Sequence, residues 1–237
     1  LRLRNATVIA QKPMKIRPRI LSGALTLRSG QLFTVDAQNR TQTDLNKLGI
    51  FRSVNLSVTP LDSLRGSDTL DVAIDAQFDY PLEAALETDV TSKSNSFIGP
   101  GITFKVSNNN LFRGGERLRI DASVANIGAG DMDYILGARL DRPATLNADT
   151  TAYVDAGIGK LTEDDYDLKY AEFGFGLTYI PSDEFTADVE LQYRALRASD
   201  ESGVTNFRLL ALPMSATLDM RQVEKTDAKS GYWLQGM

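Results

Sequence analysis

Apolar and polar residues alternate along most of the chain, and the alternation is clearest between Leu168 and Ile180. The apolar residues there, expected to face outward, are Ala171, Phe173, Phe175, Leu177 and Tyr179, whereas Glu172, Gly174, Gly176 and Thr178 are expected to face inward. A strand places successive side chains on opposite faces, so such a segment predicts one apolar and one polar face. Because the polar face is too charged for a sandwich core, the pattern favours a membrane barrel, apolar outside and wet inside.

The same alternation predicts about eight antiparallel strands after Pro81. They are expected at Leu82–Val90, Gly101–Ser107, Glu116–Asn126, Tyr134–Leu140, Thr151–Lys160, Leu168–Ile180, Ala187–Ala195 and Phe207–Leu218. In the last of these, Leu209 and Ala211 are expected on the apolar face. In the Leu168–Ile180 strand, Phe175→Arg is expected to cost far more than Gly176→Ser, because only the first would place a polar group in lipid.

Residues 1–78 have a different pattern, which predicts the order β-α-α-β-β. A short strand around Val8 and Ile9 is followed by a helix candidate over residues 16–25 and a turn at Gly30. Thr34 is suited to cap a second helix, and two alternating segments, 51–60 and 69–77, predict strands. The predicted fold is therefore β-rich, with an α+β domain in residues 1–78 and antiparallel transmembrane barrel strands in residues 81–237.

The amino-acid composition argues against several classes of function. The chain has no Cys and no His, which excludes disulfides, thiol chemistry and a histidine base. The net charge of −5 argues against a nucleic-acid binder. No apolar run is long enough for a membrane helix, and the mean hydropathy of −0.21 does not separate a soluble protein from a barrel. Since the first residue is Leu1 and no signal peptide is visible, we expect a fragment of a longer precursor.

Candidate chemistry is sparse. Glu87 and Asp89 lie on one face of a predicted strand, where acids more often line a lumen than catalyse a reaction. The Gly-rich turn after Arg113 lacks the Lys and Ser or Thr of a phosphate loop, and the acidic segment 164–167 lacks the spacing of a calcium loop. We therefore expect no catalytic residue, no cofactor and no metal site.

The junction between the second helix and the following strand carries a first resemblance. The sequence from Thr43 to Leu56, with the β-α-α-β-β order around it, resembles a POTRA domain, the periplasmic module of the Omp85 superfamily. The resemblance implies that Leu48, Gly49, Phe51 and Val54 join the helix to the strand beneath it. Any small α+β domain with a similar turn is the alternative.

Two further motifs are similar to the BamA/TamA branch of that superfamily. The first contains Asn110, Leu111, Phe112 and Glu116, and the second contains Asp219, Arg221, Gly231 and Tyr232. The second motif lacks the prolines usual in its turn. The Arg-Gly-Phe motif of the superfamily does not occur, so we expect about half of the barrel to be missing. Short loops and the first motif favour a TamA-like member.

The resemblance implies an outer-membrane assembly factor that inserts barrel proteins or autotransporters. The first barrel strand would offer an unpaired edge to a client strand, and its outward residues Leu82, Ala84, Leu86 and Val90 would mark that lateral seam. The expected partners are unfolded clients, membrane lipid, and periplasmic chaperones or accessory subunits that bind the POTRA domain. The expected location is the bacterial outer membrane, with the POTRA domain in the periplasm.

Three other functions remain open at this stage. A two-partner secretion transporter would pass a polypeptide through the lumen, past residues such as Glu87, Arg117 and Arg119. A pore or surface antigen would share the strands without the POTRA-like start. A soluble β-sandwich binding module is the alternative outside the membrane.

Overall fold

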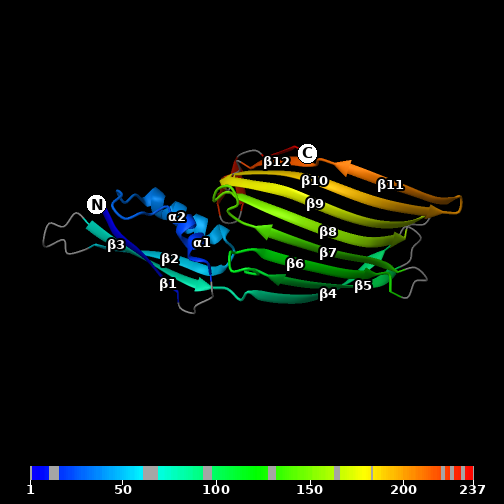
Figure 1. The fold of residues 1–237 in the computed structure, drawn as a ribbon, viewed down its shortest axis with the longest axis horizontal. Coiled ribbons are helices and arrows are strands. Elements are labelled where there is room, and N and C mark those ends of the chain that lie inside the picture. The colour runs from blue at the N-terminus through cyan, green and yellow to red at the C-terminus, as the bar shows by residue number, and fades with distance from the viewer. Residues whose placement is uncertain are drawn as a thin grey trace. The chain divides into compact units, whose positions relative to one another are not determined.

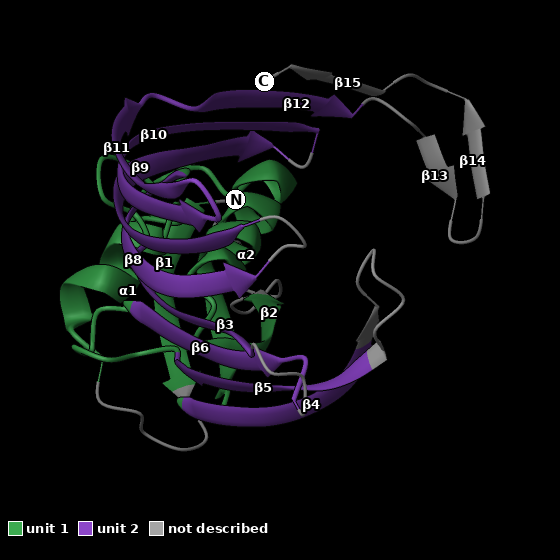
Figure 2. Ribbon diagram, turned by 90° about the vertical axis from the view of Figure 1, so that its right-hand side faces the viewer, with its two compact units in different colours: residues 1–81, 109–116, 143–149 green, residues 82–108, 117–142, 150–237 purple. Residues whose placement is uncertain are grey.

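The computed structural model describes most of the chain as two compact units. The described residues are 2–10, 16–60, 69–92, 98–127, 132–162, 166–182 and 184–219, together with three short strands after them. The first unit comprises residues 1–81, 109–116 and 143–149, and the second comprises the remaining residues up to 237 (Figure 2). The first unit therefore contains two turns that are distant in sequence from its main part.

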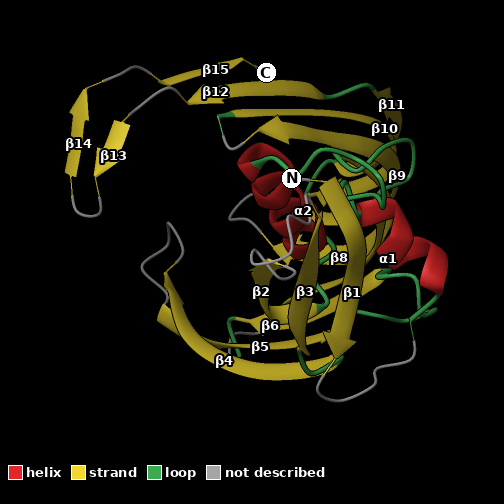
Figure 3. Ribbon diagram, turned by 90° about the vertical axis from the view of Figure 1, so that its left-hand side faces the viewer, coloured by secondary structure: helices red, strands yellow, loops and turns green. Residues whose placement is uncertain are grey.

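The first unit is built on three strands and two helices in the order β-α-α-β-β (Figure 3). The elements are β1 (Arg2–Ala10), α1 (Pro18–Ala24), α2 (Val35–Lys47), β2 (Phe51–Pro60) and β3 (Thr69–Phe78). The central strand β3 pairs in parallel with β1 and antiparallel with β2. The sheet thus has the order β1-β3-β2.

The ends of α2 follow from local chemistry. The side chain of Thr34 accepts a hydrogen bond from the backbone N–H of Ala37 at 3.1 Å, so the predicted cap is confirmed. After the helix, Gly49 has φ +65°, a conformation that glycine adopts without steric cost. The predicted first helix was too long, because α1 covers only residues 18–24, and β1 extends well before Val8.

The core of the first unit lies where α2 packs over the sheet. The fully buried apolar residues include Leu45 on α2, Ile50 shortly after it, and Leu70, Val72 and Ile74 along β3. The β3 residues alternate with more exposed neighbours, as expected for a strand with one covered face. The core is therefore continuous from helix to central strand.

The second unit is an antiparallel sheet in which neighbouring strands follow chain order (Figure 1). Its strands are β4 (Leu82–Ser92), β5 (Ile98–Asn108), β6 (Arg117–Ala125), β7 (Asp133–Arg142), β8 (Thr150–Thr162), β9 (Asp167–Ser182), β10 (Phe185–Asp200), β11 (Gly203–Ala211), β12 (Met214–Asp219) and β15 (Trp233–Gly236). A separate two-stranded sheet joins β13 (Gln222–Glu224) and β14 (Asp227–Ser230). The predictions of a β-rich fold and of antiparallel strands are confirmed.

The strand predicted at residues 207–218 is interrupted at Pro213. β11 and β12 both pair with β10, and their registers are continuous across the interruption. Proline has no N–H to donate to the ladder, although the carbonyl of Pro213 still accepts from the N–H of Glu190 at 3.0 Å. One predicted strand is therefore two.

The register also corrects the predicted apolar face of β11. Leu210 pairs with Tyr193, whereas Leu209 pairs with Arg194, whose side chain bonds Glu172 on the polar face. Paired residues in an antiparallel sheet project to the same side. Leu209 and Ala211 therefore lie on the polar side, and Leu210 lies with the apolar residues.

Candidate functional site

The edge of the large sheet at β4 is the first component of the candidate site. Within the described residues β4 pairs with β5 alone, and β4 ends the strand order of its sheet. Leu86 and Val90 are 69% and 72% exposed, and Leu82 and Ala84 on the same face are exposed as well. The predicted seam residues thus form an exposed apolar row beside a row of backbone N–H and C=O groups.

The opposite face of β4 is polar. The ammonium of Lys105 donates to both carboxylate oxygens of Glu87, at 2.9 and 2.7 Å, across the β4–β5 pair. The carboxylate of Asp89 lies against Gly101, and a side chain at Gly101 would collide with it. These contacts tie β4 to β5 and leave the outer edge of β4 without a side-chain tie to another described strand.

The turn at residues 109–116 is held by two side chains of the first predicted motif. Oδ1 of Asn110 accepts from the N–H of Gly115 at 3.1 Å, and Oε2 of Glu116 accepts from the N–H of Gly114 at 2.8 Å. Both side chains are buried, whereas Phe112 is exposed. Gly115 has φ +76°, which favours glycine there. The motif residues therefore build a turn of fixed shape.

This turn contacts the α+β part of the first unit. The backbone N–H of Arg17 donates to the carbonyl of Arg113 at 2.8 Å. A Cβ on Gly115 would lie 3.6 Å from the carbonyl oxygen of Leu48, at van der Waals contact, so the turn lies directly against the end of α2. The turn and the helix end form one packed surface.

The second turn, at residues 143–149, contacts the same helix through charge. Nζ of Lys47 lies 2.6 Å from Oδ1 of Asp149, and Arg40 lies 4.0 Å from the same carboxylate. Burial raises the pKa of the neighbouring Asp44, against the opposing effect of Lys47 and Arg40. Arg40 in the middle of α2 and Lys47 at its end thus both face the carboxylate of the turn.

The four residues predicted to join the helix to the next strand lie at the same end of α2. Leu48, Phe51 and Val54 are buried in the core, and Gly49 makes the turn between them. The ring of Phe51 stacks on that of Phe78, with centroids 5.0 Å apart. The helix-to-strand junction is therefore part of the buried core of the unit.

The polar face of the large sheet contains a buried cluster that the sequence pattern missed. Tyr153 is 2% exposed and donates to Asp188 at 2.9 Å, with Glu190 at 3.1 Å. The guanidinium of Arg139 lies 3.5 Å above the centre of its ring. Asp141 accepts hydrogen bonds from Arg139 and from Arg119 on a neighbouring strand, each at 2.8 Å.

Tyr153 also corrects the expectation for Gly176. The ring of Tyr153 lies directly over Gly176, so a Cβ there would overlap it. Gly176→Ser is therefore not a mild substitution, since the ring has filled the space above the glycine. The ring of Tyr170 covers Gly159 in the same way. An aromatic residue paired across strands with a glycine is therefore the sequence signal that could have located such contacts.

The second predicted motif is described only at Asp219. Its backbone N–H donates to the carbonyl of Glu184 at 2.7 Å, and its strand partner is Trp233. Arg221, Gly231 and Tyr232 lie outside the described residues. Within the described part of the chain no helix is long and apolar enough to cross a membrane. The same part contains no acidic cluster arranged to hold a metal ion.

Comparison with solved structures identifies proteins of similar fold. BamA from Haemophilus ducreyi lacking POTRA domains 1–3 matches 99% of the chain with a TM-score of 0.66 and 9% identity. CdiB from Acinetobacter baumannii and from Escherichia coli each match 92% of the chain at 11% identity, with TM-scores of 0.69 and 0.58. BamA and CdiB are members of the Omp85 superfamily.

The coverage and the sequence identity of these matches limit the similarity to the fold. The chain spans 47%, 42% and 41% of the three solved chains, which is less than half of each. No protein-family model matches the sequence, and a search of curated proteins gives no match. The similarity therefore lies in the fold: the antiparallel sheet resembles the barrel of Omp85 proteins.

Proposed function

We propose that the chain is the α+β domain and part of the barrel of an Omp85-type outer-membrane protein, in the bacterial outer membrane. In this proposal the α+β unit is a POTRA domain in the periplasm. Its β-α-α-β-β order and its β1-β3-β2 sheet support this assignment, as does the similarity to BamA and CdiB. The proposal includes no catalytic step and no cofactor.

The proposed activity is assembly of barrel proteins or autotransporters through a seam at β4. The observation that carries it is the outer edge of β4, which follows the α+β domain directly and has no paired strand within the described residues. Such an edge provides unpaired N–H and C=O groups to which an incoming strand can add. The exposed row at Leu82, Ala84, Leu86 and Val90 would then lie beside the apolar residues of the client.

Accessory contacts are proposed for the α+β unit. β2 is an outer strand of the three-stranded sheet and offers a second template for strand addition, to clients, chaperones or accessory subunits. We assign the protein to the BamA/TamA branch, as a TamA-like member. The turn built by Asn110 and Glu116 supports the branch, since these side chains give its motif a structural role.

Site-specific photocrosslinking tests the seam. A photoreactive residue at Leu86 should capture a barrel client during assembly, whereas the same residue at Val154 should not, because β8 is paired on both sides. Both positions are exposed on the apolar face, so the comparison isolates the free edge. Equal capture at the two positions would exclude the seam at β4.

A second candidate function is secretion of a polypeptide through the lumen. The CdiB neighbours and the charged inner face, with Arg119 and Asp141, favour it. In that case a photoreactive residue at Arg119 should capture the passenger, and Leu86 should not. A structural pore or surface antigen would give capture at neither position.

A further inference from the structure

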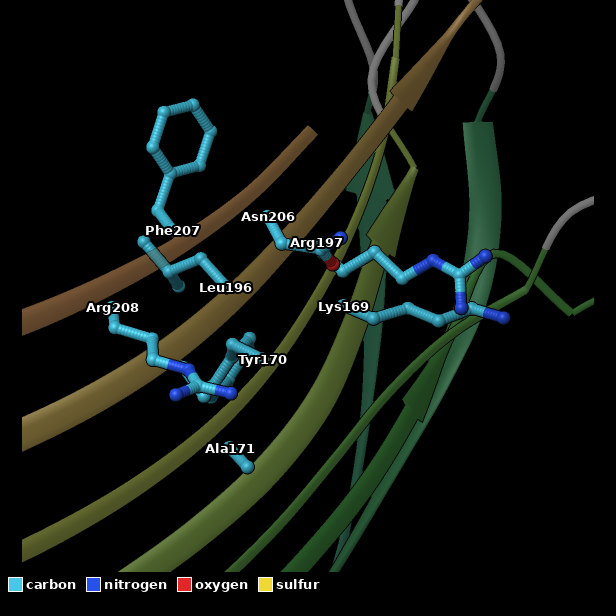
Figure 4. Close-up of a pocket in the computed structure, with 9 residues that line it drawn as sticks. Lys169, Tyr170, Ala171, Leu196, Arg197, Asn206, Phe207 and Arg208 are labelled. Carbon is cyan, nitrogen blue, oxygen red and sulfur yellow. The ribbon is translucent and has the colours of Figure 1, made fainter. Parts of the chain in front are cut away.

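Three adjacent strands carry a group of cations on the apolar face of the large sheet. Lys169 on β9 pairs in register with Arg197 on β10, so their side chains project to the same side. Arg208 on β11 pairs with Ala195, two residues from Arg197, and therefore lies on that side as well. Figure 4 shows Lys169 and Arg197 extending side by side.

This side of the sheet is the apolar one. Phe173 and Phe175 lie four and six positions after Lys169 on β9, and therefore on the same face. Each is about half exposed. Their partners on β10 are Tyr193 and Leu191, which are also exposed. On β9, β10 and β11 this face carries one Lys or Arg per strand, and all three lie toward the end opposite the turns 109–116 and 143–149.

The three cations are not paired with any acid among the residues that the structure describes. Within the described residues none of Lys169, Arg197 and Arg208 has an ion pair or a side-chain hydrogen bond. The acid on this face of β9, Asp167, lies 3.5 Å from Lys160 on β8 instead. Like charges directly opposite one another destabilise a sheet, so an anion bound between these cations would stabilise the arrangement.

The cations border a groove that can receive such an anion. The groove has a volume of about 570 Å³, and its lining includes the three cations, Asn206, and the small residues Ala171 and Ala195. Tyr170, Leu196 and Phe207 complete the lining. The two small alanine side chains leave room close to the backbone, and arginine binds phosphate oxygens in a bidentate manner. The groove thus has a lining of positive charge that suits a phosphate group.

We propose that this groove binds the headgroup phosphate of an anionic membrane lipid, whose acyl chains lie along Phe173 and Phe175. Phe175 lies six positions after Lys169, about 20 Å along a strand, which places the apolar row within reach of the acyl chains. Cations beside an anionic membrane surface attract lipid phosphates. The inference rests on the proposed function, because the apolar face must contact lipid.

Electron paramagnetic resonance of spin-labelled lipids tests the proposal with the full chain in phosphatidylcholine bilayers. Labelled phosphatidic acid should associate with the protein more strongly than labelled phosphatidylcholine. Arg197→Gln should lower that preference about threefold to fivefold, the effect expected for one cation near the membrane surface. Lys169→Gln should act in the same way, and Arg197→Lys should retain most of the preference.

Arg194→Gln is the matched control, since it removes one charge from the same strand on the opposite face. It should leave the preference unchanged. Excess inorganic phosphate should displace the labelled lipid only weakly, and full displacement would overturn the assignment to a lipid. If the protein restricts lipid motion but shows no preference for phosphatidic acid, the proposed phosphate site is refuted, whereas the membrane location of the apolar face is supported. No restricted lipid at all would refute both.

Discussion

Lys47 and Asp149, 102 residues apart in sequence, form an ion pair with 2.6 Å between Nζ and Oδ1. Both side chains are largely shielded from water, at 24% and 14% exposed. The pair connects the last turn of α2 to the turn between β7 and β8. This contact therefore holds the turn at residues 143–149 against α2 within the first unit.

The ion pair should contribute measurably to stability. In a double-mutant cycle, Lys47→Ala and Asp149→Ala should show a coupling of about 1 to 2 kcal/mol, as expected for a partly buried charged hydrogen bond. Denaturant unfolding of the full chain measures it. The pair Arg4–Asp71, at 2.7 Å but more exposed, should give a smaller coupling. Equal coupling in the two cycles would mean that Lys47 and Asp149 are solvated.

The turn at 109–116 should depend on the side chain of Asn110. Asn110→Ala leaves the buried N–H of Gly115 without its acceptor and should cost about 1 to 3 kcal/mol of unfolding free energy. Phe112→Ala in the same turn should change stability by less than about 0.5 kcal/mol, because Phe112 is 53% exposed. Urea unfolding of both variants checks the difference, and a neutral Asn110→Ala would show that the turn does not need this hydrogen bond.

Gly176 should tolerate no side chain while Tyr153 lies above it. Gly176→Ala should destabilise the sheet by about 1 to 3 kcal/mol, the usual cost of overpacking. Gly137→Ala is the control, since a Cβ there meets nothing within 4 Å. Thermal unfolding in detergent compares the two. If both variants unfold alike, the ring does not occupy the position described.

The raised pKa of Asp44 should make the free energy of unfolding decline as pH rises. Its pKa is raised above 3.8 in the folded protein, mainly by burial, so the folded state binds more protons than the unfolded state above that pH. The stability that this pKa shift contributes is fully present below the pKa of Asp44 in the unfolded state. It is lost as pH rises through the pKa of Asp44 in the folded state. Asp44→Asn should remove this decline.

Asp71 supplies the comparison of opposite sign. A hydrogen bond from Arg4 lowers the pKa of Asp71, so its contribution is present above the unfolded pKa and is lost as pH falls through the folded pKa. Asp71→Asn should therefore flatten the acid side of the profile. The free energy of unfolding measured across the acid range distinguishes the two variants, and identical profiles would contradict the assigned environment of Asp44.

Local patterns were sufficient for much of the fold. Alternation located the strand that contains Phe173 and Phe175, and the cap at Thr34 located the start of α2, because both signals depend on near neighbours in sequence. The interruption at Pro213 was also readable from sequence, since proline cannot donate to a ladder, but the prediction passed over it.

The polar cluster around Tyr153 could not be located in the same way. Its partners Asp188 and Glu190 lie on β10, and the contact with Gly176 depends on the pairing of β8 with β9. The register between strands is set by pairing across the sheet, which the alternation within one strand does not specify. The groove beside Lys169 has the same origin, because its cations meet only through the pairing of three strands.

The attachment of the turn at 143–149 has a consequence for the order of folding. The core of the first unit closes between Leu3 and Ala76, whereas the ion pair to Asp149 spans a longer loop and costs more chain entropy to form. We expect the α+β core to form first and to capture this turn afterwards. β7 and β8 would then begin to pair at the captured end, so that the small domain nucleates a hairpin of the large sheet.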